Sequence, residues 1–254
     1  MRDDVSIMWS FRNRLPELKK SITTAHNTCE RSAEFHLVDA ASEDATLKEL
    51  RSLCSDFDRK IRISESSYRS SLSEAWNLGM MMTDCRYVIF ASSDVVFLNY
   101  GWHSDIMASL RQGYQYVLME SHSVFGFDKK AIPKIGWFDE QFAIGPHFDV
   151  DFMIRASETG VSLANIKNNN YFTHIGLPGS YMERIKNPLE NYLPMNDFTN
   201  EYVFNGKWAS SWPGWKSAFE AGLDDVPHPP TNIRQVTRLK PEIDPHPVYT
   251  EKYR

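Results

Sequence analysis

The sequence predicts an α/β fold, in which a mostly parallel central sheet is flanked by helices. The chain has 254 residues, of which 42% are hydrophobic and 24% charged, and this composition suits one large globular domain. Segments with the composition of strands alternate four times with segments of helical periodicity between residues 5 and 111. Residues 87–91 are rich in aromatic and β-branched side chains and carry no charge, which indicates a strand buried on both faces.

The individual elements follow from local patterns along the chain. Strands are predicted in the first half at residues 5–9, 35–38, 60–63 and 87–91. Two helices are predicted from apolar positions that share one face, at Leu15, Leu18 and Ile22 and at Leu47, Leu50 and Leu53. Two more are predicted over residues 70–82 and 102–111. In the second half we expect strands at residues 116–120, 161–166 and 171–174, and a helix over 149–159 that ends before Gly160.

The chain divides into two regions of different character. Residues 1–176 contain all the predicted elements and are expected to form one domain. Residues 177–254 mix Pro, Gly, Asn and aromatic residues, and six of the prolines follow residue 226. We expect this second region to be an irregular extension packed on the core.

Composition excludes several classes of protein. The net charge of −5 gives no basic field for nucleic acid. The charged start, Met1-Arg-Asp-Asp-Val, predicts no signal peptide, and no apolar run of about 18 residues could span a membrane. The three cysteines, Cys29, Cys54 and Cys85, have neither metal-ligand spacing nor the even count of a disulfide framework, so we expect a reducing, cytoplasmic compartment.

The strand at residues 87–91 runs directly into Ser92, Ser93 and Asp94. In open α/β sheets, ligands bind just outside the carboxyl ends of the strands. A carboxylate there suits a hard cation such as Mg²⁺ or Mn²⁺, whose shell a nucleotide diphosphate can complete. Asp94 could equally cap the next turn, and this segment alone favours neither role.

Four other residues have a functional and a structural interpretation. Asp39 ends a strand and could accept a hydrogen bond from a base or a ribose, although an Asx turn is the commoner use. Asp149 and Asp151 begin a helix, where they could stabilise it through the helix dipole, or one of them could act as a general base. His174 ends a strand and could ligate a metal or simply pack.

Taken in order, the motifs resemble the GT-A glycosyltransferases, in particular the inverting family 2. The resemblance covers roughly residues 4–176 and is specific for fold and reaction class but not for substrate. It rests on Ser10-Phe-Arg-Asn-Arg14, residues 38–46, Ala75-Trp-Asn-Leu-Gly79, residues 92–102, residues 136–142 and residues 148–160.

The resemblance implies transfer of a sugar, most often from a UDP-sugar, to an acceptor hydroxyl on a glycan, with inversion. Ser10, Phe11 and Arg12 would line the nucleotide pocket, together with Ser92 and Ser93, and Asp39 would contact the uracil or ribose. Asp94, helped by His174, would hold Mn²⁺ or Mg²⁺ against the diphosphate. Asp149 aligns with the family's catalytic base, and Asp151 is the alternative base.

The sequence departs from the family pattern in two places. Ser92 stands where the first acidic residue of an Asp-x-Asp motif is usual, which removes one hard metal ligand. Phe148 stands where Glu is usual before the catalytic carboxylate. In the C-terminal region, Trp208, Trp212 and Trp215 could form an acceptor platform, although packing onto the core is the favoured role of such large rings.

Two rival functions remain open at this point. A nucleotidyltransferase would usually carry a glycine-rich phosphate loop near its first strand, and residues 5–20 contain no glycine. A catalytically inactive sugar-nucleotide-binding module would explain Ser92, because fold does not determine function. The compact architecture resembles stand-alone glycosyltransferases of bacteria or large DNA viruses, in which case the compartment would be the cytoplasm or host cytoplasm.

Overall fold

The computed structural model describes residues 5–66, 70–119, 121–140, 148–167 and 170–175. The predicted extension at residues 177–254, with Trp208, Trp212 and Trp215, lies outside the described residues. Within the described residues, no helix combines the length and apolar character needed to cross a lipid bilayer.

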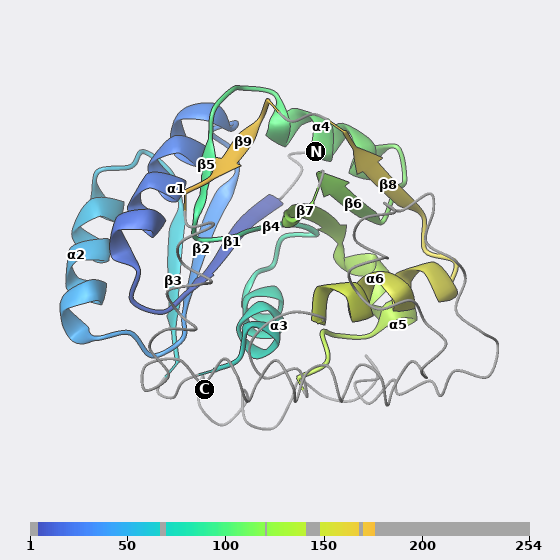
Figure 1. Ribbon diagram of the computed structural model, residues 1–254, viewed down its shortest axis with the longest axis horizontal. Helices are drawn as coiled ribbons and strands as arrows, with labels where there is room; N and C mark the ends of the chain where they lie inside the picture. Colours follow the sequence, from blue (N-terminus) through green and yellow to red (C-terminus); the bar gives the residue numbers. More distant parts are fainter. Residues whose placement is uncertain (1–4, 67–69, 120, 141–147, 168–169, 176–254) are drawn as a thin grey trace.

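A seven-stranded sheet forms the centre of the fold (Figure 1), in the order β3-β2-β1-β4-β7-β6-β8. Neighbouring strands are parallel except at β7, which is antiparallel to both β4 and β6. This confirms the predicted mostly parallel sheet. The strands are β1 (Val5–Phe11), β2 (Glu34–Asp39), β3 (Ile61–Glu65), β4 (Tyr87–Ala91), β6 (Tyr116–Met119), β7 (Ser121–Asp128) and β8 (Leu163–Ile166).

Helices cover both faces of this sheet, as the sequence predicts. On one face, α1, α2 and α4 pack on strand residues such as Ile7, Trp9 and Ile89. On the other face, α3, α5 and α6 pack on the alternating residues, which include Met8 and Phe90. The helices are α1 (Leu15–Thr28), α2 (Asp44–Ser55), α3 (Leu72–Met82), α4 (Trp102–Arg111), α5 (Ile132–Ile135) and α6 (Phe148–Glu158), with a 3₁₀ turn at Lys129–Ala131.

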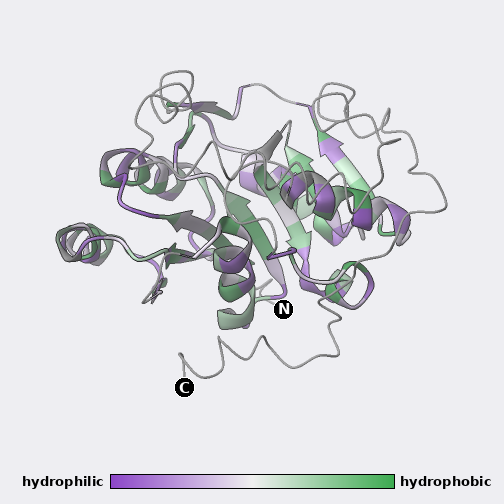
Figure 2. Cartoon of the chain, turned by 60° about the horizontal axis from the view of Figure 1, so that its bottom comes forward, coloured by the Kyte–Doolittle hydropathy of each residue, from purple (hydrophilic) through white to green (hydrophobic). Residues whose placement is uncertain are grey.

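The hydropathy of the elements agrees with this layering. Figure 2 shows central strands that are mainly hydrophobic, flanked by helices that carry both hydrophilic and hydrophobic residues. Burial of strand side chains on both sides is what a mostly parallel sheet requires, because its faces never meet water. The uncharged composition of residues 87–91 is therefore explained by their place in β4, at the middle of the sheet.

Strand β7 and the short helix α5 were not predicted. The β7 sequence, Ser-His-Ser-Val-Phe-Gly-Phe-Asp, contains polar residues and a glycine, which weaken the signal of a strand. Gly126 has a packing role here, because a Cβ at this position would lie 2.3 Å from Cγ2 of Ile106 in α4. The glycine thus allows α4 to approach the sheet closely.

A second, two-stranded sheet was also missed as a unit. It pairs β5 (Val95–Phe97) with β9 (Phe172–His174) in antiparallel fashion, and Val95 lies opposite His174. The segment at residues 171–174 was predicted as a strand, but its partner was not. This pairing brings the end of the described chain back to the segment that follows β4.

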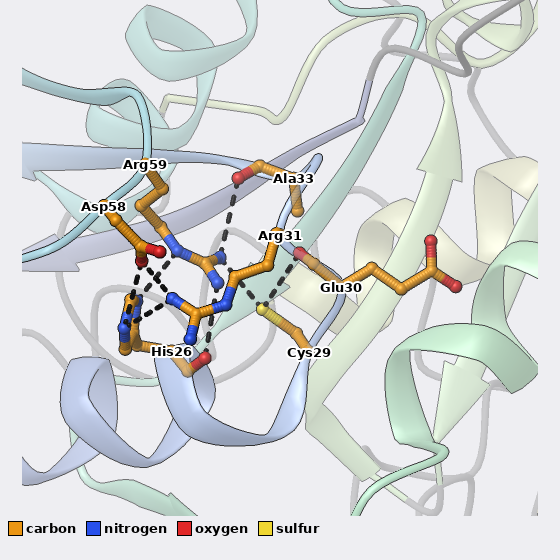
Figure 3. Close-up of polar contacts among 7 residues, drawn as sticks. All are labelled: His26, Cys29, Glu30, Arg31, Ala33, Asp58 and Arg59. Atoms are coloured by element: carbon orange, nitrogen blue, oxygen red, sulfur yellow. Dashed lines mark hydrogen bonds and ion pairs between the residues drawn. The ribbon is translucent and has the colours of Figure 1, made fainter.

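Arg59 fastens the C-terminal end of α1 to the sheet (Figure 3). Its Nε donates to Nδ1 of His26 at 3.0 Å. Its guanidinium also lies over the Phe35 ring in β2, 4.0 Å from the ring centre. Burial, then the charges of Arg59 and Arg31, lower the pKa of His26. Because α1 runs antiparallel to the strands it follows, this cluster lies at the opposite end of α1 from the cleft described next.

Candidate active site

A cleft of about 340 Å³ opens at the carboxyl ends of β1 and β4. These two strands are neighbours at the centre of the sheet. After β1 the chain adds β2 and β3 on one side, and after β4 it adds β6, β7 and β8 on the other side. Such a switch point is where open α/β sheets bind ligands. The cleft is lined by Ser10, Phe11, Arg12, Arg14, Ala40, Ser70, Leu72, Trp76, Ala91, Ser92, Ser93 and Asp94.

The turn between β1 and α1 forms one wall of the cleft. Asn13 and Arg14 both adopt left-handed backbone conformations, with φ values of 54° and 47°. The turn is fixed to the loop after β2, because Asn13 N–H donates to Oγ of Ser42 at 2.7 Å and its Oδ1 accepts from Glu43 N–H at 3.0 Å. This arrangement carries Arg14 to the mouth of the cleft.

Asp94 lies at the opposite wall, between a histidine and an arginine. Its Oδ1 is 3.7 Å from Nδ1 of His174, and its Oδ2 is 3.7 Å from Nη1 of Arg14. Burial disfavours the charged carboxylate, but the contact with His174 and the positive charge of Arg14 outweigh it, so the pKa of Asp94 is lowered. Asp94 is therefore ionised at neutral pH.

The structure brings Asp94 and His174 together, as the sequence interpretation of a metal pair requires. The β5–β9 pairing places them side by side, and Ile175 N–H donates to the Asp94 carbonyl at 2.9 Å. Nδ1 of His174 is buried and forms no hydrogen bond with any residue that the structure describes. An unpartnered ring nitrogen beside an ionised carboxylate fits a divalent cation. In the part of the chain that is described, no group of three His, Cys, Asp or Glu side chains forms a fuller ligand set.

Asp39 lies beside the cleft rather than in its lining, which includes its neighbour Ala40. The Asp39 carboxylate is buried and accepts the Ser42 N–H at 3.0 and 3.1 Å, which is an Asx turn. Burial raises the pKa of Asp39, and the hydrogen bonds from Ser42 partly offset the rise. The structure thus realises the Asx-turn interpretation of Asp39.

Asp149 and Asp151 occupy different environments in the first turn of α6. Asp149 is half-buried. Burial of Tyr116 in β6 is the main cause that raises the pKa of that tyrosine, and the negative charge of Asp149 raises it further. Asp151 is fully buried, and its Oδ2 accepts from Nε of Arg155 at 3.0 Å in an ion pair. Neither aspartate is among the residues that line the cleft as described.

Asn77 joins two motifs that the sequence presented separately. From α3, its Oδ1 accepts the Phe138 N–H at 3.0 Å, and its Nδ2 donates to the Phe138 carbonyl and to Oε1 of Glu140, each at 2.9 Å. The same helix contributes Trp76 to the cleft, which sequence reasoning did not select. Asn77 therefore fixes the Gly-Trp-Phe-Asp-Glu segment relative to a cleft-lining helix.

Arg14 is the principal cleft residue missing from the predicted site. Arg14 is one of four arginines, with Arg12, Arg62 and Arg69, whose guanidinium could reach a diphosphate, but solvation at the surface is the favoured role for most of them, so the predicted site does not include Arg14. The available signal was its place in the first-strand turn, beside the predicted pocket residues Ser10 to Arg12. The structure places Ser10, Phe11, Arg12, Ser92, Ser93 and Asp94 together in the cleft, as predicted.

Comparison with known proteins agrees with this architecture. Residues 6–164 match the model of the family described as Glycosyl transferase family 2, so the chain belongs to this family. The prediction of a glycosyltransferase with a GT-A fold is thereby confirmed at the level of family and fold. No curated protein matches the chain.

Solved structures share the fold at low sequence identity. The mannosyltransferase PcManGT from Pyrobaculum calidifontis, in complex with GDP-Man and Mn²⁺, is 14% identical with a TM-score of 0.59 over 73% of this chain. This chain spans 61% of the mannosyltransferase's length. Residues 1–349 of S. aureus TarS are 14% identical, with a TM-score of 0.58 over 82% of this chain and 72% of that one. GalNAc-T7 with UDP, GalNAc and Mn²⁺ is 11% identical, with a TM-score of 0.62 over 94% of this chain and 54% of that one.

Proposed function

We propose that the protein transfers a sugar from a nucleotide-sugar donor to a hydroxyl group of a glycan acceptor. The observation that carries this proposal is an ionised Asp94, flanked by Arg14 and His174, at the mouth of a cleft at the carboxyl ends of β1 and β4. The printed ligands of the fold relatives support a donor of this class, since they include GDP-Man, UDP and UDP-GlcNAc.

In this proposal the donor lies across the two walls of the cleft. Ser10, Phe11 and Arg12 line the side that receives the nucleotide, and Asp39 accepts a hydrogen bond from the base or ribose. Ser92 and Ser93 lie along the other wall, which leads to Asp94. A UDP-sugar is the favoured donor, because UDP occurs in several of the related structures.

Asp94 and His174 are the residues that would hold a divalent cation, Mn²⁺ or Mg²⁺. Mn²⁺ is present in three of the related structures. Such a cation, when bound, offsets the negative charge that develops on the departing diphosphate. With one carboxylate and one imidazole, the protein supplies few ligands, so phosphate oxygens and water would complete the shell.

Asp149 is the proposed general base that takes the proton of the acceptor hydroxyl, which gives inversion at the transferred sugar. Asp149 is half-buried at the start of α6, so part of its side chain is exposed to solvent. The ion pair of Asp151 with Arg155 makes that residue the weaker candidate, because its carboxylate is fully buried and held by a guanidinium.

The remaining proposals concern whole regions of the chain and its compartment. We place donor binding and catalysis in residues 1–176. For Trp208, Trp212 and Trp215, an acceptor platform is the alternative to packing onto the core. A reducing, cytoplasmic location is supported by Cys29, Cys54 and Cys85, all of which are free thiols.

The substitution Asp149→Asn tests the proposed chemistry. It removes the basic carboxylate but keeps its size, so donor affinity in calorimetry should stay unchanged. The rate of sugar transfer, and of the slow hydrolysis of the donor, should fall about 10²–10⁴-fold, which is the usual contribution of a general base.

The companion substitution Asp151→Asn measures the structural role of the neighbouring carboxylate. It leaves Arg155 buried without the Asp151 charge, so the free energy of unfolding should fall by about 3–5 kcal/mol. Normal turnover by Asp149→Asn would contradict the base assignment. Donor binding by a wild-type protein that neither transfers nor hydrolyses the sugar would instead identify an inactive binding module.

A further inference from the structure

We propose that Arg14 is a built-in cation for the donor's diphosphate, so that a nucleoside diphosphate binds this cleft without any metal ion. A divalent cation then tightens an interaction that already exists. This inference rests on the proposed function, because it assigns the diphosphate of the same donor.

The charges of the cleft favour an anion even before a metal is added. Among the residues that line it, Arg12 and Arg14 are cationic and Asp94 is the one acid. Ser92 supplies a hydroxyl where a second carboxylate would be needed for a strong cation site. The described lining therefore carries a net positive charge that a diphosphate would complement.

The backbone fixes the position of Arg14. Its left-handed conformation, φ 47° and ψ 37°, is unfavourable for a residue with a side chain by about 1–2 kcal/mol. The turn is nevertheless held by the contacts of Asn13 with Ser42 and Glu43, and the Arg14 carbonyl accepts the Leu18 N–H at 3.1 Å. These contacts hold the backbone at Arg14, whose side chain lines the cleft.

The guanidinium of Arg14 lies near two carboxylates, but its N–H groups donate no hydrogen bond to the residues that the structure describes. Its Nη atoms lie 3.5 Å from Oε1 of Glu17 and 3.7 Å from Oδ2 of Asp94, and its side chain is 28% exposed. By contrast, Arg86 donates to both carboxylate oxygens of Asp128 at 2.6–3.2 Å. The donors of Arg14 remain available, and their planar fork suits the oxygens of a phosphate.

Arg14 and a metal ion would share the same carboxylate. The guanidinium faces one oxygen of Asp94, and His174 faces the other. A cation that binds Asp94 would repel Arg14 toward the phosphates, where charge-assisted hydrogen bonds are strongest. The two cations therefore act together on the diphosphate but compete for Asp94 when no nucleotide is present.

Calorimetric titration of UDP and GDP tests this inference, with EDTA or with Mn²⁺, on the wild type and Arg14→Gln. We expect the wild type to bind one nucleotide in EDTA and more tightly in Mn²⁺. Arg14→Gln should lose about tenfold or more of the affinity in EDTA, which corresponds to one charge-assisted hydrogen bond, and lose less in Mn²⁺. Titration of Mn²⁺ alone should show equal or tighter binding to Arg14→Gln than to the wild type.

Two further variants make the result interpretable. Arg31→Gln removes an exposed arginine at the far end of α1 and should leave nucleotide affinity unchanged. Arg14→Lys keeps the charge but loses the planar fork, so its affinity in EDTA should lie between those of the wild type and Arg14→Gln. Thermal melts of each variant verify that the fold is intact.

The outcomes distinguish this inference from the proposed function. Wild-type binding that is seen only with Mn²⁺, or equal affinities of wild type and Arg14→Gln in EDTA, would overturn the role of Arg14 and leave the transferase proposal standing. Failure of folded wild-type protein to bind either nucleotide in both conditions would overturn both.

Discussion

Asp94 lies between His174 and Arg14, and these neighbours keep its carboxylate ionised at neutral pH. An ionised carboxylate at a strand end has two uses in this cleft. It attracts a divalent cation, and it orients the guanidinium that faces the same space. Because it is 14% exposed, the charge is accessible to a ligand but partly shielded from water.

The substitution Asp94→Ala should therefore change metal dependence rather than abolish all binding. Without this carboxylate His174 is the one remaining ligand of the proposed pair, so Mn²⁺ should no longer increase nucleotide affinity. Calorimetry of UDP-sugar binding with and without Mn²⁺ measures the effect. Asp84→Ala, which removes an exposed aspartate outside the cleft, should retain the full Mn²⁺ response. A normal Mn²⁺ response in Asp94→Ala would show that the cation binds elsewhere.

Much of the residue-level site follows from one rule, that polar residues at the carboxyl ends of central strands converge. Asp94 follows the central strand β4, as this rule requires, whereas His174 ends β9 of the two-stranded sheet and was selected as a strand-end imidazole. The two residues are 80 positions apart in sequence and meet in the structure. Arg14 could not be distinguished from solvated arginines, because its position depends on two consecutive left-handed residues, Asn13 and Arg14, in a turn without glycine. Local sequence gives little signal for such a conformation, since left-handed arginine is uncommon.

At the scale of elements, Asn77 holds α3 to the segment that precedes α6. Its side chain satisfies both the N–H and the carbonyl of Phe138 in a buried setting. The hydrogen bond to Glu140 extends the same link toward the part of the chain that leads to Asp149. One buried amide thus joins the cleft-lining helix α3 to Phe138 and Glu140.

The substitution Asn77→Ala should destabilise the protein and impair transfer together. Two buried backbone groups of Phe138 would lose their partners, which should lower the free energy of unfolding by about 2–4 kcal/mol. Urea unfolding measures this loss, and steady-state kinetics at a permissive temperature measures the loss of transfer. Asn99→Ala is the matched control, because Asn99 is exposed and makes one hydrogen bond, to the Asn170 carbonyl. Equal stabilities of the two variants would refute the structural role of Asn77.

The elements that the sequence predicted are those with strong periodicity or long apolar runs. The helix at residues 102–111 has the same bounds in the structure, and β4 matches residues 87–91. Strand β7 and the β5–β9 pair were missed for a physical reason: β7 contains Ser121, His122 and Gly126, and β5 is three residues long. Their stability comes from the strands and helix beside them rather than from local propensity.

At the scale of the whole molecule, two buried histidines link stability to pH. His36 and His103 lie on β2 and α4, and burial is the main cause that lowers the pKa of each to about 4. Nε2 of His36 is hydrogen-bonded to Oγ of Ser64 at 2.8 Å, whereas neither ring nitrogen of His103 forms a hydrogen bond within the described part of the chain. Both rings are therefore neutral in the folded state at physiological pH.

We predict that the protein loses stability as pH falls from about 6.5 toward 4. In that window the unfolded chain binds a proton at each histidine and the folded chain does not, so protonation favours unfolding. Each histidine contributes on the order of 3 kcal/mol to the loss by pH 4. Urea unfolding at intervals from pH 7.5 to 4.5 measures the slope.

The substitution His103→Phe isolates one of the two contributions. Phenylalanine keeps an aromatic ring in the buried position and removes two unpartnered nitrogens. The variant should be as stable as the wild type or more so at pH 7.5, and its stability should fall less steeply below pH 6.5. An unchanged slope would mean that His103 does not carry the acid sensitivity.

The most direct test of the proposed function is calorimetric titration of the wild-type protein with a panel of UDP- and GDP-sugars, with and without Mn²⁺. We expect binding of one nucleotide-sugar, strengthened by Mn²⁺, since the cleft offers Arg14, Asp94 and His174 to a diphosphate and its cation. Absence of binding to every nucleotide-sugar, by protein shown to be folded, would contradict the assignment of this cleft as a donor site.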